Sequence, residues 1–140
     1  MIITSDIHLG TERKSHTTTE SRKKLSQAIY DQIISIQQRS EEKLVLLGDL
    51  FDHYSNPEEV LLQGLDVLQK CDICLAGNHD HSNREDKTGS LQLLDIVWDD
   101  TLIPQLKVGF SGSTDIGEYT FVPHHSSQEM FVETLESLPG

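Results

Sequence analysis

The sequence predicts a single α/β domain, in which helices flank a layered and largely parallel β-sheet. Its 140 residues are enough for one compact domain with its own core. Three short apolar, β-prone runs occupy residues 1–5, 44–47 and 73–76, and such continuous runs are typical of strands buried in a parallel sheet. Helical patterns separate these runs, and strands that alternate with helices favour an α/β architecture.

Two amphipathic helices are predicted between the three strands. The first follows a polar loop at residues 10–19 and covers about residues 20–38, where apolar residues recur at spacings of three and four. Those residues are Leu25, Ile29, Ile33 and Ile36. The second starts near Pro57 with two acidic residues, which interact favourably with the helix dipole. Its apolar positions are Val60, Leu61, Leu65 and Leu68.

The remainder of the chain carries weaker signals. A short helix is predicted at residues 91–94. Strands are predicted at residues 106–110 and 119–122, and they are expected to pair as a hairpin around residues 112–117. A last helix is predicted at residues 127–138. Its apolar face would contain Phe131, Leu135 and Leu138.

The charge balance is acidic, with 11 basic and 23 acidic residues and a net charge of −12. This counts against nonspecific coating of nucleic acid, because proteins that do so are usually basic. It counts less against a metal enzyme, because bound divalent ions reverse the charge locally. No apolar run approaches the roughly 18 residues that span a membrane. The first residues lack a signal-peptide pattern, so we expect a cytoplasmic protein that does not act at membranes.

The two cysteines, Cys71 and Cys74, form a Cys-x-x-Cys pair. Such a pair is found in zinc sites and in redox motifs, but the chain holds no second pair to complete a zinc site. The alternative, which we favour, is that both are small apolar residues of a buried strand. In a strand that covers residues 71–76, their side chains would lie on opposite faces.

Three polar clusters carry the chemical signal, and each directly follows a predicted strand. They occupy residues 6–8, 48–52 and 77–80. The carboxyl ends of parallel strands meet at one edge of the sheet, which is where open α/β sheets bind ligands. Each cluster alone resembles an ordinary turn, since Gly, Asp and Asn are common in turns. All three together at strand ends indicate a functional site.

Oxygen and nitrogen ligands are combined in these clusters. Asp6, Asp49 and Asn78 offer oxygen atoms, and His8 and His79 offer imidazole nitrogens. Mixed sites of this kind suit manganese, iron or zinc without a thiolate. One carboxylate bridges two ions roughly 3.5–4 Å apart in two-metal hydrolases, where the ions activate water and neutralise phosphate oxygens.

The clusters resemble the motifs of the calcineurin-like metallophosphoesterase superfamily. The matching segments are Ser5-Asp6-Ile7-His8-Leu9-Gly10, Gly48-Asp49-Leu50-Phe51-Asp52 and Gly77-Asn78-His79-Asp80. The Leu-Gly after the first motif and the Phe-Asp at the end of the second motif are most similar to the nuclease subunit of double-strand-break repair complexes of bacterial and phage type. Residues 121–125 are similar to a hydrophobic-Pro segment of that branch. The resemblance is good over residues 1–80 and loose over residues 106–138.

The resemblance implies a role for each metal ligand. Asp6 and His8 would bind the first metal ion, Asp49 would bridge both ions, and Asn78 would bind the second ion and touch the phosphate. Mn²⁺ is the expected metal, with Zn²⁺, Fe²⁺ or Mg²⁺ as alternatives. A metal-activated hydroxide would attack the phosphorus atom without a covalent enzyme intermediate.

Further residues would act around the ligands. His79 would serve as general acid or polarise the phosphate, and Asp80 would orient His79 by a hydrogen bond. Asp52 would support the second loop rather than bind metal. His53, which follows Asp52, could line the substrate cleft or simply lie in the loop before the next helix.

The sequence departs from the superfamily pattern in its downstream histidines. The full pattern has a histidine at a later strand end and then a Gly-His-x-His motif, neither of which is present. We therefore expect residues 1–140 to form the N-terminal portion of a phosphoesterase domain, with a sheet that is incomplete at its C-terminal end. His124 and His125 follow a predicted strand and are alternative candidates for a missing ligand.

The resemblance favours a manganese-dependent DNA nuclease, exonuclease or endonuclease. The first alternative is a phosphatase or phosphodiesterase for small molecules, which the acidic charge favours. The second is a noncatalytic assembly subunit, because the second ion would lack ligands. Arg13 and Lys14 belong to a basic segment that either contacts DNA phosphates or is a solvated loop. The expected partners are a second copy of the chain and an ATPase of the coiled-coil type.

Overall fold

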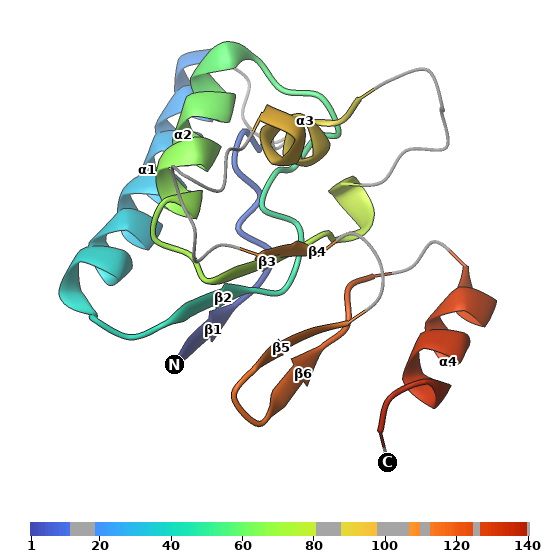
Figure 1. Cartoon of the computed structure of the whole chain (residues 1–140). Helices are drawn as coiled ribbons and strands as arrows, with labels where there is room; N and C mark the ends of the chain where they lie inside the picture. The colour runs from blue at the N-terminus through green and yellow to red at the C-terminus, as the bar shows by residue number, and fades with distance from the viewer. Residues whose placement is uncertain (12–18, 81–87, 98–106, 110–112, 125–126, 140) are drawn as a thin grey trace.

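The structure of the chain is a computed structural model, which describes residues 1–11, 19–80, 88–97, 107–109, 113–124 and 127–139 (Figure 1). A four-stranded parallel sheet forms its centre, and the strands lie side by side in the order in which they occur along the chain. The strands are β1 (Ile2–Thr4), β2 (Leu44–Leu46), β3 (Ile73–Leu75) and β4 (Lys107–Gly109). The three predicted N-terminal strands and the predicted α/β class are confirmed.

Three helices cover one face of this sheet: α1 (Thr19–Arg39), α2 (Glu58–Leu68) and α3 (Ser90–Val97). A single core cluster joins apolar side chains of these helices to Leu44, Leu46 and Cys74 of the strands. Crossovers between adjacent parallel strands are almost always right-handed, so helices that link successive strands lie on the same side. Among the described helices, none is long and apolar enough to cross a lipid bilayer.

Helix α1 buries a face that is rotated slightly from the predicted one. Ile29 and Ile33 pack against the core, as expected, but Ile36 keeps 38% of its surface exposed. Gln37 takes the next buried position, one turn after Ile33, and its amide Nε2 donates to the carbonyl of Val67 at 2.8 Å. A hydrogen bond to α2 thus replaces the apolar contact that the pattern predicted.

The C-terminal part of the described chain contains a hairpin of β5 (Thr114–Ile116) and β6 (Tyr119–Phe121). The predicted pairing of residues 106–110 with 119–122 is therefore wrong. β4 extends the parallel sheet beside β3, and residues 114–116, which were expected to lie in the turn, form β5. Gly117, with φ of 59°, makes the actual turn much shorter.

The hairpin covers part of the second face of the sheet, where Ile116 and Phe121 pack against Val45, Ile73 and Leu75. This cover does not reach all of β1, because Ile3 remains 48% exposed. The expectation that residues 1–5 form a fully buried strand is therefore wrong, because β1 is an edge strand that is covered mainly on the helical side.

The last helix, α4 (Gln128–Glu136), confirms the helix predicted there, and its N-cap residue Ser127 accepts a hydrogen bond from the backbone of Met130. Its predicted apolar face is not buried against the described residues, since Phe131 and Leu135 remain exposed.

Both cysteines are free and fully buried, which confirms that they serve as core residues. Their expected placement on opposite faces is wrong. Cys71 precedes β3 instead of belonging to it, and its thiol and that of Cys74 join the same cluster beneath the helices.

Candidate metal centre

The three polar clusters meet at the carboxyl edge of the sheet because the first two loops run alongside each other. The backbone N–H of Asp6 donates to the carbonyl of Gly48 at 3.1 Å, and that of His8 donates to the carbonyl of Asp49 at 3.0 Å. Leu9 continues this ladder to Leu50 at 2.8 Å. The ladder fixes the first motif directly beside the second.

An uncommon backbone conformation aims the three candidate ligands of these loops. Asp6, His8 and Asp49 have φ angles of 54°, 51° and 52°, respectively. They are the only non-glycine residues with positive φ in the described part of the chain. Strained backbone of this kind is typically retained at functional sites.

Two glycines allow the second and third loops to touch. A Cβ atom on Gly77 would lie 2.0 Å from Oδ1 of Asp49 and 2.4 Å from its backbone nitrogen. A Cβ atom on Gly48 would lie 2.9 Å from the Cα of Gly77, and Gly48 has a φ of 120°. Side chains at either position would push Asp49 away from the third motif.

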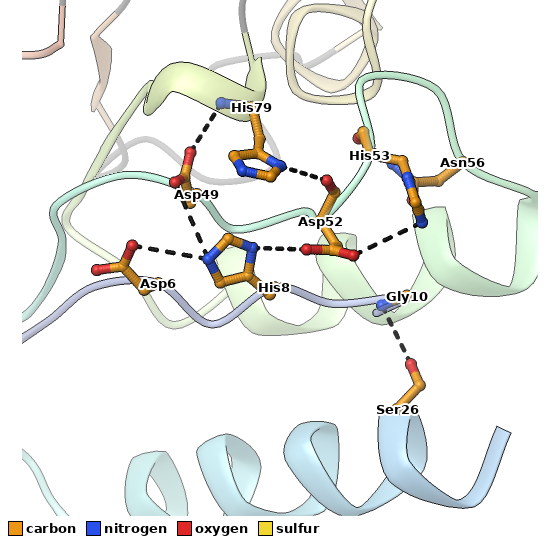
Figure 2. A network of polar contacts seen from close by, with 9 residues as sticks. All are labelled: Asp6, His8, Gly10, Ser26, Asp49, Asp52, His53, Asn56 and His79. Atoms are coloured by element: carbon orange, nitrogen blue, oxygen red, sulfur yellow. Dashed lines mark hydrogen bonds and ion pairs between the residues drawn. The ribbon is translucent and has the colours of Figure 1, made fainter. Parts of the chain in front are cut away.

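Asp6, His8 and Asp49 form the first cluster of candidate ligands (Figure 2). Nε2 of His8 lies 3.6 Å from Oδ1 of Asp6 and 4.0 Å from Oδ2 of Asp49. Their ligand atoms all lie within 4.8 Å of one another, which leaves room for one ion among them. The first three ligands predicted from the sequence are thus brought together.

His79 lies in a short 3₁₀ helix, Asn78–Asp80, and connects the third motif to the second. Its backbone N–H donates to Oδ1 of Asp49 at 3.0 Å, and its ring Nδ1 contacts the carbonyl oxygen of Asp52. Its ring packs edge-on against His8, with 4.9 Å between centroids. The hydrogen bond to the Asp52 carbonyl raises the pKa of His79, and the nearby carboxylates raise it further.

Asp80 does not hold the His79 ring, so the predicted hydrogen bond between these two side chains is wrong. The carboxylate of Asp80 instead accepts from the backbone N–H of Gly77 at 2.7 Å. It is 5% exposed, and this burial raises its pKa to about 6. Asp80 therefore stabilises the turn that presents Asn78 and His79.

The residue that orients His79 is Asp52, for which the sequence predicted a supporting role in the second loop. Its main-chain oxygen holds His79, while its carboxylate lies 2.9 Å from Nδ1 of His8 and 3.6 Å from Nε2 of His53. His8, Asp52 and His79 form the second cluster of candidate ligands. The second Asp of the Gly-Asp-x-x-Asp motif was a signal in the sequence that Asp52 matters. Nothing in the sequence indicated that its main-chain carbonyl would contact His79.

The donor set fits divalent metal ions. Three carboxylates and two imidazoles gather there, and a bound cation would offset the repulsion among the carboxylates. Nδ1 of His8 is buried and, although close to Asp52, lacks a hydrogen bond of acceptable geometry. The chemistry of these atoms suits Mn²⁺, Fe²⁺ or Zn²⁺.

The remaining predicted site residues lie in different places. Asn78 is exposed at the start of the 3₁₀ helix, next to His79. His53 is exposed beside Asp52. His124 donates its backbone N–H to Ala76 at 3.3 Å, near the end of β3, but is not part of either cluster. Arg13, Lys14 and His125 lie outside the described residues.

A protein-family model described as calcineurin-like phosphoesterase matches residues 1–140. The chain belongs to the calcineurin-like phosphoesterase family. Comparison with curated proteins gives no match. Family membership implies metal-dependent hydrolysis of phosphoester bonds, and the two clusters give this phosphoesterase residues that could bind the metal. The parallel sheet with its helices agrees with the fold that the family implies.

Proposed function

We propose that this calcineurin-like phosphoesterase is a nuclease that hydrolyses DNA phosphodiesters with two divalent ions, best supplied as Mn²⁺. The observation that carries the hydrolytic part is the convergence of Asp6, His8 and Asp49 within 4.8 Å. The choice of DNA rests on the resemblance of the motif sequences to those of the nuclease branch. The most similar parts are the Leu-Gly pair after the first motif and the Phe-Asp pair that ends the second motif.

The ligands divide between two ions in this proposal. Asp6, His8 and Asp49 would hold the first ion, and Asp49 and Asn78 would hold the second. When bound, the ions supply an activated water and neutralise the phosphate oxygens. Asp49 also fixes His79 through its contact with the backbone N–H of that residue.

His79 donates a proton to the leaving oxygen. A carbonyl oxygen only accepts hydrogen bonds, so Nδ1 of His79 must carry a hydrogen toward Asp52. The proton for the leaving oxygen must then come from Nε2, so His79 acts as the imidazolium, the form that its raised pKa favours. Asp52 thus selects which ring nitrogen does the chemistry, which is the usual effect of a residue behind a catalytic histidine.

A small-molecule phosphatase or phosphodiesterase is the second candidate. The net charge of −12 favours it, because an acidic surface repels the extended phosphate backbone of DNA. A noncatalytic assembly role is the third candidate, and it would follow if the second ion binds too weakly to act.

The test combines hydrolysis with metal binding. We expect Mn²⁺-dependent cleavage of bis(p-nitrophenyl) phosphate and of linear DNA by the full chain. His79→Ala should lower kcat by about 10²–10⁴-fold, the usual worth of a general acid, and leave Mn²⁺ affinity nearly unchanged in calorimetry. Asp49→Asn should lose both metal and activity.

Each outcome selects one candidate. Efficient DNA cleavage supports the nuclease. Cleavage of the small ester with DNA untouched would replace the nuclease with the small-molecule enzyme. A folded chain that neither binds Mn²⁺ tightly nor cleaves either substrate would point to the assembly role.

A further inference from the structure

A cavity of about 230 Å³ lies beside the metal centre. Its walls come from the first turns of α1, the first turns of α2 and the two loops that carry the first and second motifs. It therefore adjoins the loops that carry the candidate metal ligands.

The cavity is connected to the metal centre through side chains. His53 lines the cavity, and its Nε2 lies 3.6 Å from Oδ2 of Asp52. The other oxygen of Asp52 lies 2.9 Å from His8 in the metal cluster (Figure 2). Gly10, which lines the opposite wall, follows His8 by two residues. A group in the cavity is thus next to the reacting bond.

Hydrogen bonds hold the cavity walls in place. The backbone N–H of Gly10 donates to Oγ of Ser26 at 3.1 Å, which ties the first loop to α1. Asn56 donates to the carbonyl of His53 at 2.7 Å and to Oγ of Ser90 at 2.9 Å. A Cβ atom on Gly10 would lie 3.0 Å from Val60, so the glycine keeps this space open.

The chemistry of the lining excludes a second phosphate and suits an uncharged ring. Apart from His53, the lining holds one cation, Lys23, and one anion, Glu59, so these two charges sum to zero. A phosphate subsite would instead require several cations or a fork of donors. Pro57 and Val60 supply apolar surface, and His53 supplies a ring for stacking.

Two amide oxygens in the walls need hydrogen-bond donors. Oδ1 of Asn56 and Oε1 of Gln63 are buried and have no hydrogen-bond partner among the described residues. The hydroxyl groups of a sugar and the amine or imide N–H of a base are donors of this type. Both residues line the cavity, so a sugar or base bound there is the candidate donor.

We propose that this cavity binds the nucleoside moiety, sugar or base, on one side of the scissile phosphoester; the substrate class rests on the proposed function. The volume supports this assignment, because cavities for drug-sized ligands begin at about 300 Å³. A space of about 230 Å³ lies just below this range, so it fits a single sugar or base ring. The cavity would then select nucleoside esters over simple phosphates.

The first experiment measures binding of thymidine to the full metal-free chain in EDTA, with the methyl NMR signals of Val60 as the readout. We expect saturable shifts with thymidine and none with inorganic phosphate. Lys23→Trp should fill the mouth of the cavity and weaken binding by about tenfold or more. Lys24→Trp is the matched control, because Lys24 is the next exposed lysine of α1 and does not line the cavity. Gln63→Leu should weaken binding without filling the space.

The second experiment separates this inference from the proposed function. In Mn²⁺, Lys23→Trp should raise KM for thymidine 5′-(p-nitrophenyl) phosphate by the same factor, and leave hydrolysis of methyl p-nitrophenyl phosphate, which has no second ring to place in the cavity, unchanged. If the chain hydrolyses neither ester, the proposed function fails, while thymidine binding still decides the cavity. Absence of shifts at millimolar thymidine, or equal losses in Lys23→Trp and Lys24→Trp, would overturn the cavity assignment.

Discussion

Left-handed backbone at Asp6, His8 and Asp49 concentrates strain at the candidate metal ligands. Each such residue costs on the order of 1–3 kcal/mol unless its surroundings enforce it. The ladder between the first two loops, with its hydrogen bonds from Asp6 and His8, supplies that enforcement. The ligands are therefore held in position before an ion arrives, which lowers the free-energy cost of ordering them on binding.

Gly77→Ala should damage both stability and metal binding. The added Cβ would overlap the backbone nitrogen of Asp49, which cannot rotate away as a flexible side chain would. We expect a loss of about 1–3 kcal/mol in the free energy of unfolding and a weaker Mn²⁺ affinity, measured by urea denaturation and calorimetry.

Gly117→Ala is the control for this substitution. A Cβ there would meet nothing within 4 Å, and Gly117 has a φ of 59°. It should cost about 1–2 kcal/mol for the left-handed conformation and leave Mn²⁺ affinity unchanged. Equal metal affinity in both variants would refute the close approach of the two loops as the reason for glycine at position 77.

Residue types and strand ends were sufficient to predict that Asp6, His8 and Asp49 converge, because parallel strands deliver the following residues to one edge. The partner of His79 could not be predicted in this way. It is the main-chain oxygen of Asp52, and every residue has one. The hydrogen bond from Gly77 to the Asp80 carboxylate could not be predicted either, because it depends on the 3₁₀ helix that the third motif forms.

At the scale of elements, the layer between the sheet and the helices holds the two thiols. Cys71 and Cys74 are both fully buried, and burial raises the pKa of Cys71 to about 12 and that of Cys74 well above its ordinary value. The neutral thiols are thus favoured in the folded state. Their stabilising effect is complete below the unfolded pKa of roughly 8.5 and is lost as the pH rises toward 12.

Native protein at pH 8 should therefore react very slowly with a disulfide reagent such as Ellman's reagent. In denaturant, both cysteines of the chain should react rapidly, because unfolding exposes their thiols and restores their ordinary pKa. The native rate then reports opening of this layer. Rapid reaction of either thiol in the folded protein would show that the reagent reaches that thiol without unfolding of the layer.

The elements of the parallel half were predictable because each buried strand is a continuous apolar run and each helix has a periodic apolar face. The hairpin was not. Thr114, Asp115 and Ile116 alternate in burial over only three residues, too few to distinguish a strand from a turn. In helix α1, the burial of Gln37 could not be predicted from the apolar pattern either. It is explained only by the hydrogen bond from its amide to the carbonyl of Val67.

At the scale of the whole molecule, the net charge of −12 makes the fold responsive to cations. Repulsion among acidic groups destabilises a compact state, and the metal centre concentrates several of them. A divalent ion that binds only the folded chain stabilises it in proportion to the logarithm of its concentration. Metal and fold are therefore thermodynamically coupled.

Mn²⁺ at about a hundred times its dissociation constant should add about 2.7 kcal/mol to the free energy of unfolding. We expect Tm to rise by on the order of 10 °C in differential scanning fluorimetry, with EDTA reversing the shift. Asp49→Asn should show only the small, salt-like increase that NaCl produces at equal ionic strength. An identical rise in this variant would mean that Mn²⁺ acts by general screening and not at the centre.

The order of the strands across the sheet follows their order along the chain, and both ligand clusters lie between Asp6 and His79. During synthesis, each new strand can therefore dock on the strand made just before it, without waiting for a distant segment. All the donors of the two clusters have left the ribosome once the third strand and its turn are exposed. A metal ion that binds these donors would then be able to stabilise the nascent chain while the rest of the polypeptide is still being translated.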